Sequence, residues 1–261
     1  MKAQLYSTAG EKKSTVELPA FFSTMIREDI AAKVFETEKY ELMQPYAGAK
    51  EAGKRHSASG IISHMRNTWK NHYGKGIARL PRKVMSRRGT QFFWVGAEVS
   101  QTRGGRSAHP PLGLHKSRKI NEKEILLAMK TGFAATADKE SLIKRYASLK
   151  LSKEVPQTPM IIESLPQKTK DLENFIQKVL GSLSTIAIKN KAVRSGKGKR
   201  RGRTYKSNAG LLVIKARAEK AKFSNVEVKD AQEILMRDLY PLGRLTLYTQ
   251  QALKELGGIY A

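Results

Sequence analysis

Residues 71–89 read NHYGKGIARLPRKVMSRRG, and they decide how the rest of the chain has to be organised. Glycines loosen the backbone, Pro81 interrupts it, and the Lys and Arg side chains have no carboxylate among them. Such a stretch has no apolar face that can enter a protein core. Because it lies far from both ends of the 261-residue chain, it is expected to belong to an insertion that leaves the folded part and returns to it.

The basic character extends well beyond this stretch. Residues 47–119 hold 16 Lys or Arg residues and only two acidic ones, Glu51 and Glu98. A second block, KNKAVRSGKGKRRGRTYK at 189–206, has nine Lys or Arg residues and no acidic residue. The whole chain carries 49 basic and 23 acidic residues, a net charge of +26. A surplus of this size favours a polyanionic partner, with nucleic acid placed before an anionic membrane surface.

Composition excludes several other classes of protein. The chain has no cysteine, which rules out disulfides, thiolate metal sites and a cysteine nucleophile, and which fits a reducing cytoplasm. No run of 18 apolar residues is present, so no membrane span is expected. Residues 1–14 lack the apolar centre of a signal peptide. The hydrophobic share of 40% is enough to build a core.

Outside the basic segments, the pattern of apolar residues predicts alternating strands and helices. Apolar spacing at intervals of three and four predicts helices that open at Ser23, at Asn121 in a capping box with Glu124, at Asp138, and over 169–180 with Gly181 as the stop. Alternation and short apolar runs predict strands at 3–7, 14–18, 159–164, 184–188, 211–215, 226–228 and 244–248. Asp230 with Glu233 indicates another helix start, and Thr249 is expected to open a closing helix that ends at Gly257–Gly258.

This order predicts an α/β fold. Residues 1–45 and 119–261 are expected to form a globular three-layer domain, with a mainly parallel sheet covered by helices on both faces. Residues 46–118 are expected to form an extended arm, inserted between two helices. They show no sustained apolar period, and irregular connections of this length are uncommon unless they are functional or disordered. Ordering the arm would cost on the order of 100 kcal/mol of chain entropy, so it is expected to order against a phosphate-rich surface.

The arm combines three kinds of residue that suit RNA. Arginine forks pair with phosphates, aromatic rings stack on unpaired bases, and glycines let the backbone come close to a strand. The alternative for residues 92–95 and the nearby rings is a small local cluster, and the alternative for residues 194–206 is a solvated loop. The candidate RNA-binding residues of the arm are Lys54, Arg55, Arg66, Trp69, Tyr73, Lys75, Arg79, Arg82, Lys83, Arg87, Arg88, Arg103 and Arg106. Those of the second block are Arg194, Lys197, Lys199, Arg200, Arg201, Arg203 and Lys206.

Catalytic and metal chemistry find little support. His56, His64 and His72 recur every eight residues, but no carboxylate or thiolate stands at ligand spacing, so RNA contact or solvent exposure is preferred and neither a metal nor a cofactor is expected. The glycine-rich stretch 196–202, GKGKRRG, lacks the ending of a phosphate-binding P-loop. No nucleophile elbow, HExxH motif or carboxylate cluster is present, which argues against an enzyme. A nucleic-acid enzyme or RNA chaperone that holds its substrate with the basic arm remains the alternative.

Six segments, taken in order, carry a family resemblance. They are FFSTMIREDI at 21–30, YGKGIARLPR at 73–82, GGRSAHPP at 104–111, NEKE at 121–124, RSGKGKRRGRTYK at 194–206 and LYPLGRLTLYTQQALKEL at 239–256. Together they span nearly the whole chain, and it resembles the universal L-four family of large-subunit ribosomal proteins, in its archaeal and eukaryotic branch. Tyr73 departs from the human-like members, which have Trp there, and a long tail of their kind is not expected after the last helix.

The resemblance implies a function as well as a fold. It implies a structural constituent of the large ribosomal subunit, located in the cytoplasm, that binds rRNA, contacts neighbouring ribosomal proteins and supports early subunit assembly. It also implies that the arm lines part of the peptide exit tunnel, close to the nascent peptide, with its tip at Gly74, Lys75, Gly76 and Arg79.

Overall fold

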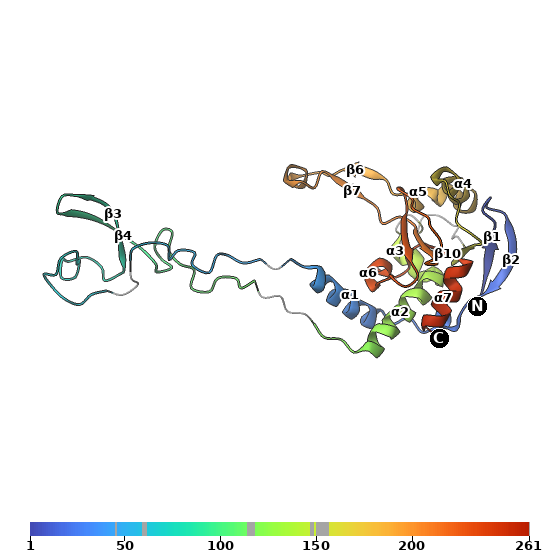
Figure 1. Ribbon diagram of the computed structural model, residues 1–261, viewed down its shortest axis with the longest axis horizontal. Helices are drawn as coiled ribbons and strands as arrows, with labels where there is room; N and C mark the ends of the chain where they lie inside the picture. The colour runs from blue at the N-terminus through green and yellow to red at the C-terminus, as the bar shows by residue number, and fades with distance from the viewer. Residues whose placement is uncertain (45, 59–61, 114–117, 147–148, 150–156, 261) are drawn as a thin grey trace. The chain divides into compact units, whose positions relative to one another are not determined.

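The computed structural model describes residues 1–44, 46–58, 62–113, 118–146, 149 and 157–260 (Figure 1). The chain divides into two compact units, one made of Met1–Leu42 with Ser117–Ala261 and the other of Met43–Lys116. Lys116, one of the basic residues counted above, lies outside the described residues. The second unit contains two strands, β3 (Arg82–Arg88) and β4 (Gln91–Gly96). Residues 92–95, for which a local cluster was the alternative to RNA stacking, therefore lie in a strand of this unit.

A six-stranded sheet forms the centre of the first unit. In spatial order its strands are β2 (Lys12–Glu17), β1 (Lys2–Tyr6), β5 (Met160–Ile162), β10 (Thr246–Thr249), β8 (Leu212–Lys215) and β9 (Glu227–Asp230). β1 and β2 pair antiparallel, and every other pairing is parallel. The predicted mainly parallel sheet is confirmed.

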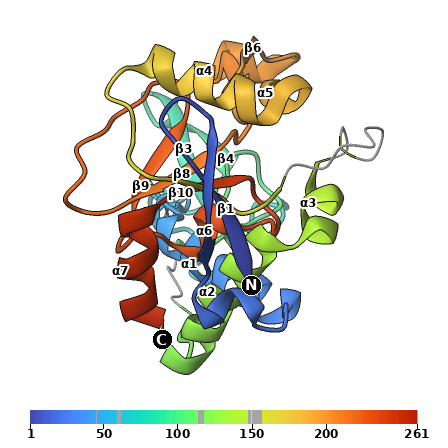
Figure 2. The ribbon, with the colours of Figure 1, turned by 90° about the vertical axis from the view of Figure 1, so that its right-hand side faces the viewer.

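Helices cover both faces of this sheet. They are η1 (Ala20–Ser23), α1 (Glu28–Leu42), α2 (Glu122–Ala137), α3 (Lys139–Arg145), α4 (Thr169–Leu180), η3 (Gly181–Leu183), α5 (Ser184–Ala187), α6 (Met236–Leu239) and α7 (Gln250–Tyr260). Buried residues of η1, α1, α2, α6 and α7 share one core, and those of α3, α4 and α5 share the other. Figure 2 shows α4 on one side of the strands, and α2 and α7 on the other. The first unit is thus a three-layer α/β/α domain.

The central strands are apolar throughout because each of them is buried on both faces. Leu212 and Ile214 point into the core under α1 and α2, whereas Leu211 and Val213 point into the core under α4. Successive strand residues face opposite sides of a sheet, so a run such as LLVI supplies two cores at once.

Several of the predicted helix ends are confirmed by backbone hydrogen bonds. The side chains of Asn121, Asp138 and Thr249 each accept a bond from an amide in the first turn of the following helix. Gly181 ends α4 with φ of +53°, a conformation that other residues rarely adopt. The spacing of polar caps therefore located these ends correctly.

Two predicted helix starts were wrong. α1 begins at Glu28, because Thr24 is extended and residues 20–23 form η1, which buries Phe21. Asp230 stays in β9, where its carboxylate pairs with Lys215 Nζ at 2.6 Å, and residues 230–233 form no helix. In both places a tertiary contact outweighs the local signal.

Three further details differ from the sequence prediction. Residues 184–187 are helical, since a short apolar run does not distinguish a strand from a buried helix turn. Glu124 pairs with Lys33 of α1 at 2.8 Å and no reciprocal capping-box bond is formed. The closing helix continues past Gly257–Gly258 to Tyr260, because the Tyr260 ring packs against Phe21 with centroids 5.9 Å apart.

Candidate nucleic-acid interface

The second unit consists of two chain limbs that pack against each other. A Cβ atom built on Gly53 would lie 2.6 Å from the backbone nitrogen of Arg106, and one built on Gly113 would lie 3.1 Å from Cβ of Ala47. From residue 47 to residue 53 on one limb, the contacting residue on the other limb goes from 113 back to 106, so the limbs run antiparallel. Gly53 also has φ of +77°, and glycine is therefore required there for two reasons.

The strands β3 and β4 form an antiparallel hairpin between the limbs. Its register pairs Arg82 with Gly96 and Arg88 with Gln91, and it shifts by one residue at Met85. Phe92 and Trp94 are two residues apart and therefore lie on the same face of β4, where their rings lie nearly parallel at 6.0 Å.

Aromatic rings from the preceding segment pack on this face. Trp69 meets Phe92 edge to face at 5.4 Å, and His72 lies 5.8 Å from Trp94. Lys75 places its ammonium group 4.7 Å from the Trp94 ring centroid. The rings thus form the local cluster that was the alternative to free stacking platforms. Trp69 nevertheless stays 65% exposed, so one large ring remains open to a base.

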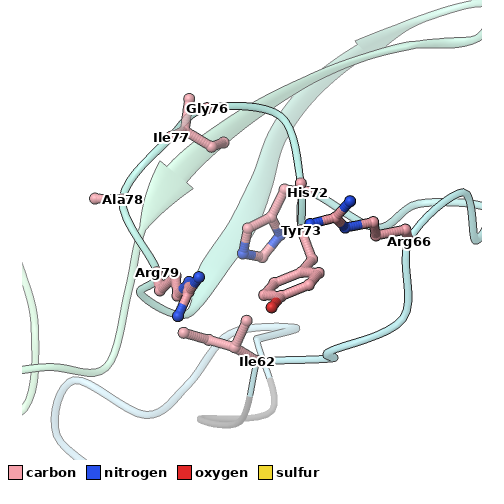
Figure 3. A pocket seen from close by; sticks show the side chains of 9 residues that line it. Ile62, Arg66, His72, Tyr73, Gly76, Ile77, Ala78 and Arg79 are labelled. Atoms are coloured by element: carbon pink, nitrogen blue, oxygen red, sulfur yellow. The ribbon is translucent and has the colours of Figure 1, made fainter.

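The loop from His72 to Leu80 encloses a small cavity of about 150 Å³ (Figure 3). His72 Nε2 approaches the carbonyl oxygen of Leu80 at 3.2 Å and so closes the loop at its base. Tyr73 points into the loop, with the guanidinium of Arg79 lying 5.4 Å from its ring centroid. His64 and Tyr73 pack in a T-shaped arrangement, with their ring centroids 5.4 Å apart.

Cations without acidic partners dominate the surface of this unit. Among residues 46–58 and 62–113 the structure has no ion pair. Of the predicted arm residues, Tyr73, Arg82, Lys83 and Arg106 are half-buried. The remaining nine are exposed: Lys54, Arg55, Arg66, Trp69, Lys75, Arg79, Arg87, Arg88 and Arg103. Uncompensated positive charge at this density attracts phosphates, and it releases counterions when phosphates bind.

The second basic block forms another hairpin, within the first unit. β6 (Lys191–Val193) and β7 (Tyr205–Ser207) pair antiparallel around the short helix η4 (Lys197–Arg201). Six of the seven predicted residues are exposed, and only Arg194 is half-buried. Asn208 ties the base of the hairpin to the domain, because its side chain donates to the carbonyl oxygens of Ile186 and Ile188. Residues 194–206, for which a solvated loop was the alternative to RNA binding, thus lie in a hairpin that is anchored to the domain.

Some exposed residues of these surfaces were not among the predicted set. Lys191 lies 4.2 Å from the ring centroid of Tyr205, and together they present a cation and an aromatic face. Lys70 stands beside Trp69 in a turn with positive φ, and Phe93 is 54% exposed on the outer face of β4. Lys191 and Lys206 lie on the paired strands β6 and β7, and three-residue strands are too short to recognise from sequence.

The three histidines of the arm do not converge on one site. His56 accepts a bond from the amide of Ala58 and contacts the carbonyl of Gly53, while His64 and His72 pack against separate rings. Over the part of the chain that the structure describes, no three His, Asp or Glu side chains are grouped as a metal site would require. In the same part, every helix is too short or too polar to cross a membrane.

Comparison with known proteins adds an independent finding. The ribosomal protein L4/L1 family matches residues 16–259. Proteins named large ribosomal subunit protein uL4 are similar along nearly their full length. That of Methanocaldococcus jannaschii is 34% identical over 98% of this chain and 98% of its own. That of Nanoarchaeum equitans is 31% identical over 98% and 97%, and that of Methanosphaera stadtmanae 32% identical over 99% and 97%. The α/β/α domain, the basic surfaces of the two units and these similarities agree, and the chain belongs to the ribosomal protein L4/L1 family.

Proposed function

We propose that this chain is a structural constituent of the large ribosomal subunit, where it binds rRNA through its two basic surfaces. The observation that carries the proposal is the set of exposed Lys and Arg side chains on residues 46–113, none of which has an ion-pair partner among the described residues. A folded protein tolerates such a surplus when a polyanion neutralises it. Membership of a ribosomal protein family identifies that polyanion as rRNA.

Catalysis has no place in this function. The family is one of ribosomal proteins, and the arm holds only the two carboxylates Glu51 and Glu98. Phosphoryl chemistry needs acidic residues that hold metal ions beside the RNA backbone. RNA binding is therefore a structural function of the chain and not a step towards catalysis. The chain is located in the ribosome, in the cytoplasm.

Three finer roles belong to the same proposal. The arm supports early subunit assembly, because its cations gather rRNA segments that otherwise repel one another. The residues Gly74, Lys75, Gly76 and Arg79 lie at its tip, where it lines part of the exit tunnel and comes close to the nascent peptide. The globular domain contacts neighbouring ribosomal proteins.

Sedimentation tests the proposal directly. An epitope-tagged chain, expressed in an archaeal host, is followed through a sucrose gradient of a native lysate with and without dissociation of the subunits. We expect it with whole ribosomes and free large subunits before dissociation and in the large-subunit peak after it, and we expect it to remain bound after a 0.5 M salt wash. Recovery at the top of the gradient, or in the small-subunit peak, would overturn the ribosomal assignment.

A further inference from the structure

The loop over residues 73–79 has the backbone pattern of an anion-binding site. Gly74 and Gly76 have φ of +79° and +71°, while Tyr73 and Lys75 between and before them do not have positive φ. Alternation of the sign of φ turns successive N–H groups toward one side, which forms a concave nest for an anion. Among the described residues, none accepts a hydrogen bond from the amides of residues 74–79.

Two arginine side chains contribute to the lining of the cavity inside this loop. Arg66 and Arg79 both line it, and no carboxylate is among its lining residues. Figure 3 shows both side chains directed toward Tyr73 from opposite sides of the loop. A cavity of about 150 Å³ accommodates a single group of about the size of benzene. The space is therefore suited to one phosphate and is too small for a nucleotide.

We propose that this cavity binds one phosphodiester group of an unpaired RNA strand. Arg66 and Arg79 would donate hydrogen bonds to its two non-bridging oxygens. The backbone amides of the Gly74–Gly76 turn would donate hydrogen bonds to the same phosphate. Arg79 is already held against the Tyr73 ring, so less side-chain entropy is lost when it binds. The inference rests on the proposed function, since it specifies which part of the RNA this loop binds.

A base is the less suitable occupant. Arg79 lies over the Tyr73 ring and His64 makes a T-shaped contact with it, so the ring is not a free stacking platform. The exposed ring of Trp69 is the better place for a base. In this arrangement the cavity positions the phosphate backbone of the RNA, and the nearby Trp69 ring contacts a base of the same strand.

The charge contribution is tested with Arg66→Gln, Arg79→Gln and the double variant, all in the full-length chain. Affinity for a large-subunit rRNA fragment is measured from 0.1 to 0.4 M KCl. One shared phosphate predicts that each single change lowers the affinity about tenfold. It also predicts that the log–log salt slope falls by about 0.7 in the double variant, and by less in each single variant, because the other arginine still neutralises the phosphate there. The double variant Arg87→Gln with Arg103→Gln is the control for independent contacts, with an expected fall of about 1.4.

The backbone contribution is tested with Gly76→Ala. A methyl group at this position meets no atom within 4 Å, so the substitution disturbs only the positive φ. Gly104→Ala is its matched control, because Gly104 has φ of +73° and is equally open. We expect both variants to have similar melting temperatures, and only Gly76→Ala to weaken rRNA binding.

Ethylation interference identifies the phosphate. Full-length protein is mixed with rRNA that is ethylated at random phosphates, and the bound RNA is recovered. Bound to the wild type, this RNA should lack ethylation at a set of phosphate positions. Arg66→Gln, Arg79→Gln and Gly76→Ala should all become tolerant at the same single position. Inorganic phosphate should also shift the amide resonances of residues 74–79 in the wild type but not in the double arginine variant.

The outcomes separate this inference from the proposed function. If the wild type fails to bind rRNA, the proposed function fails. If rRNA binding persists but the three variants lose different positions, or none, the shared-phosphate site is wrong. Amide shifts with inorganic phosphate but an unchanged interference pattern would mean that the loop holds a free anion, and this would overturn the RNA assignment.

Discussion

Gly53 and Arg106 touch so closely that the two limbs of the arm have no room for a side chain between them. A Cβ atom on Gly53 would lie 2.6 Å from the Arg106 nitrogen, and Gly53 has φ of +77°. We predict that Gly53→Ala separates the limbs and weakens rRNA binding by about tenfold more than Gly104→Ala, which shares the positive φ but not the contact. Filter binding at 0.15 M KCl measures the difference. Equal affinities for the two variants would mean that limb packing does not contribute to binding.

Limited proteolysis should cleave the arm before the domain. Residues 46–58 and 98–113 form no helix or strand, and in the free protein they have no RNA to order them. A protease of broad specificity avoids a bias toward the many basic sites. Early fragments should end within these ranges, and added rRNA should slow their appearance. First cuts within 1–42 or 157–260 would contradict this.

Binding to rRNA should depend steeply on salt. Neutralisation of about ten phosphates gives a log–log slope of about −9 on the duplex scale and about −7 for unpaired RNA. The exposed cations of the β6–β7 hairpin should account for part of it. Glutamine at Lys197, Lys199, Arg200, Arg201, Arg203 and Lys206 should therefore flatten the slope by up to about 4.

The control variant removes the same number of positive charges, but from another part of the surface. Glutamine is introduced at six exposed lysines outside both basic segments: Lys12, Lys39, Lys139, Lys168, Lys170 and Lys254. The slope should then change by less than about 1, because these side chains are not expected to touch phosphates. If both sets flatten the slope equally, net charge and not the hairpin determines binding.

A buried ion pair predicts how the stability of the domain responds to acid. Arg244 is 4% exposed and donates to Glu227 Oε2 at 2.6 Å. Burial alone would raise the pKa of Glu227, but the Arg244 guanidinium and the charges of Lys189 and Lys229 outweigh it and lower the pKa. The stabilisation is therefore present above the ordinary pKa of 4.5 and is lost as the pH falls through the lowered value.

We predict that Glu227→Gln lowers the free energy of unfolding by about 2 kcal/mol at pH 7. The gap to the wild type should narrow as the pH falls below 4.5, because the wild-type carboxylate becomes protonated as the pH passes through its lowered pKa. Urea unfolding followed by circular dichroism measures both values. The control, Glu163→Gln, removes a half-exposed pair with Lys13 and should cost less than about 1 kcal/mol. A gap that stays constant with pH would rule out Glu227 as the titrating group.

The tip of the arm should influence what passes through the exit tunnel. Replacement of residues 73–79 by seven Gly and Ser residues keeps the chain length and leaves His72, Leu80 and the β3–β4 hairpin in place. We expect large subunits to assemble, because most of the basic arm and the β6–β7 hairpin remain. Stalling by an arrest peptide, or sensitivity to a macrolide, should change in these particles. Failure to assemble, or unchanged tunnel readouts, would show that the tunnel role does not belong to this loop.

The sequence by itself determined the α/β class, the parallel sheet, most helix ends and the two basic segments. These features depend on local patterns: apolar periods, polar caps such as Asp138, and uncompensated charge between elements. Tertiary structure decided what depends on contacts between residues far apart in the chain. Asp230 remains in a strand because Lys215 pairs with it, and the last helix continues to Tyr260 because Phe21 receives its ring. Within the arm, only the folded loop brings Arg66 and Arg79 to one cavity, because thirteen positions of sequence separation carry no information about which side chains meet.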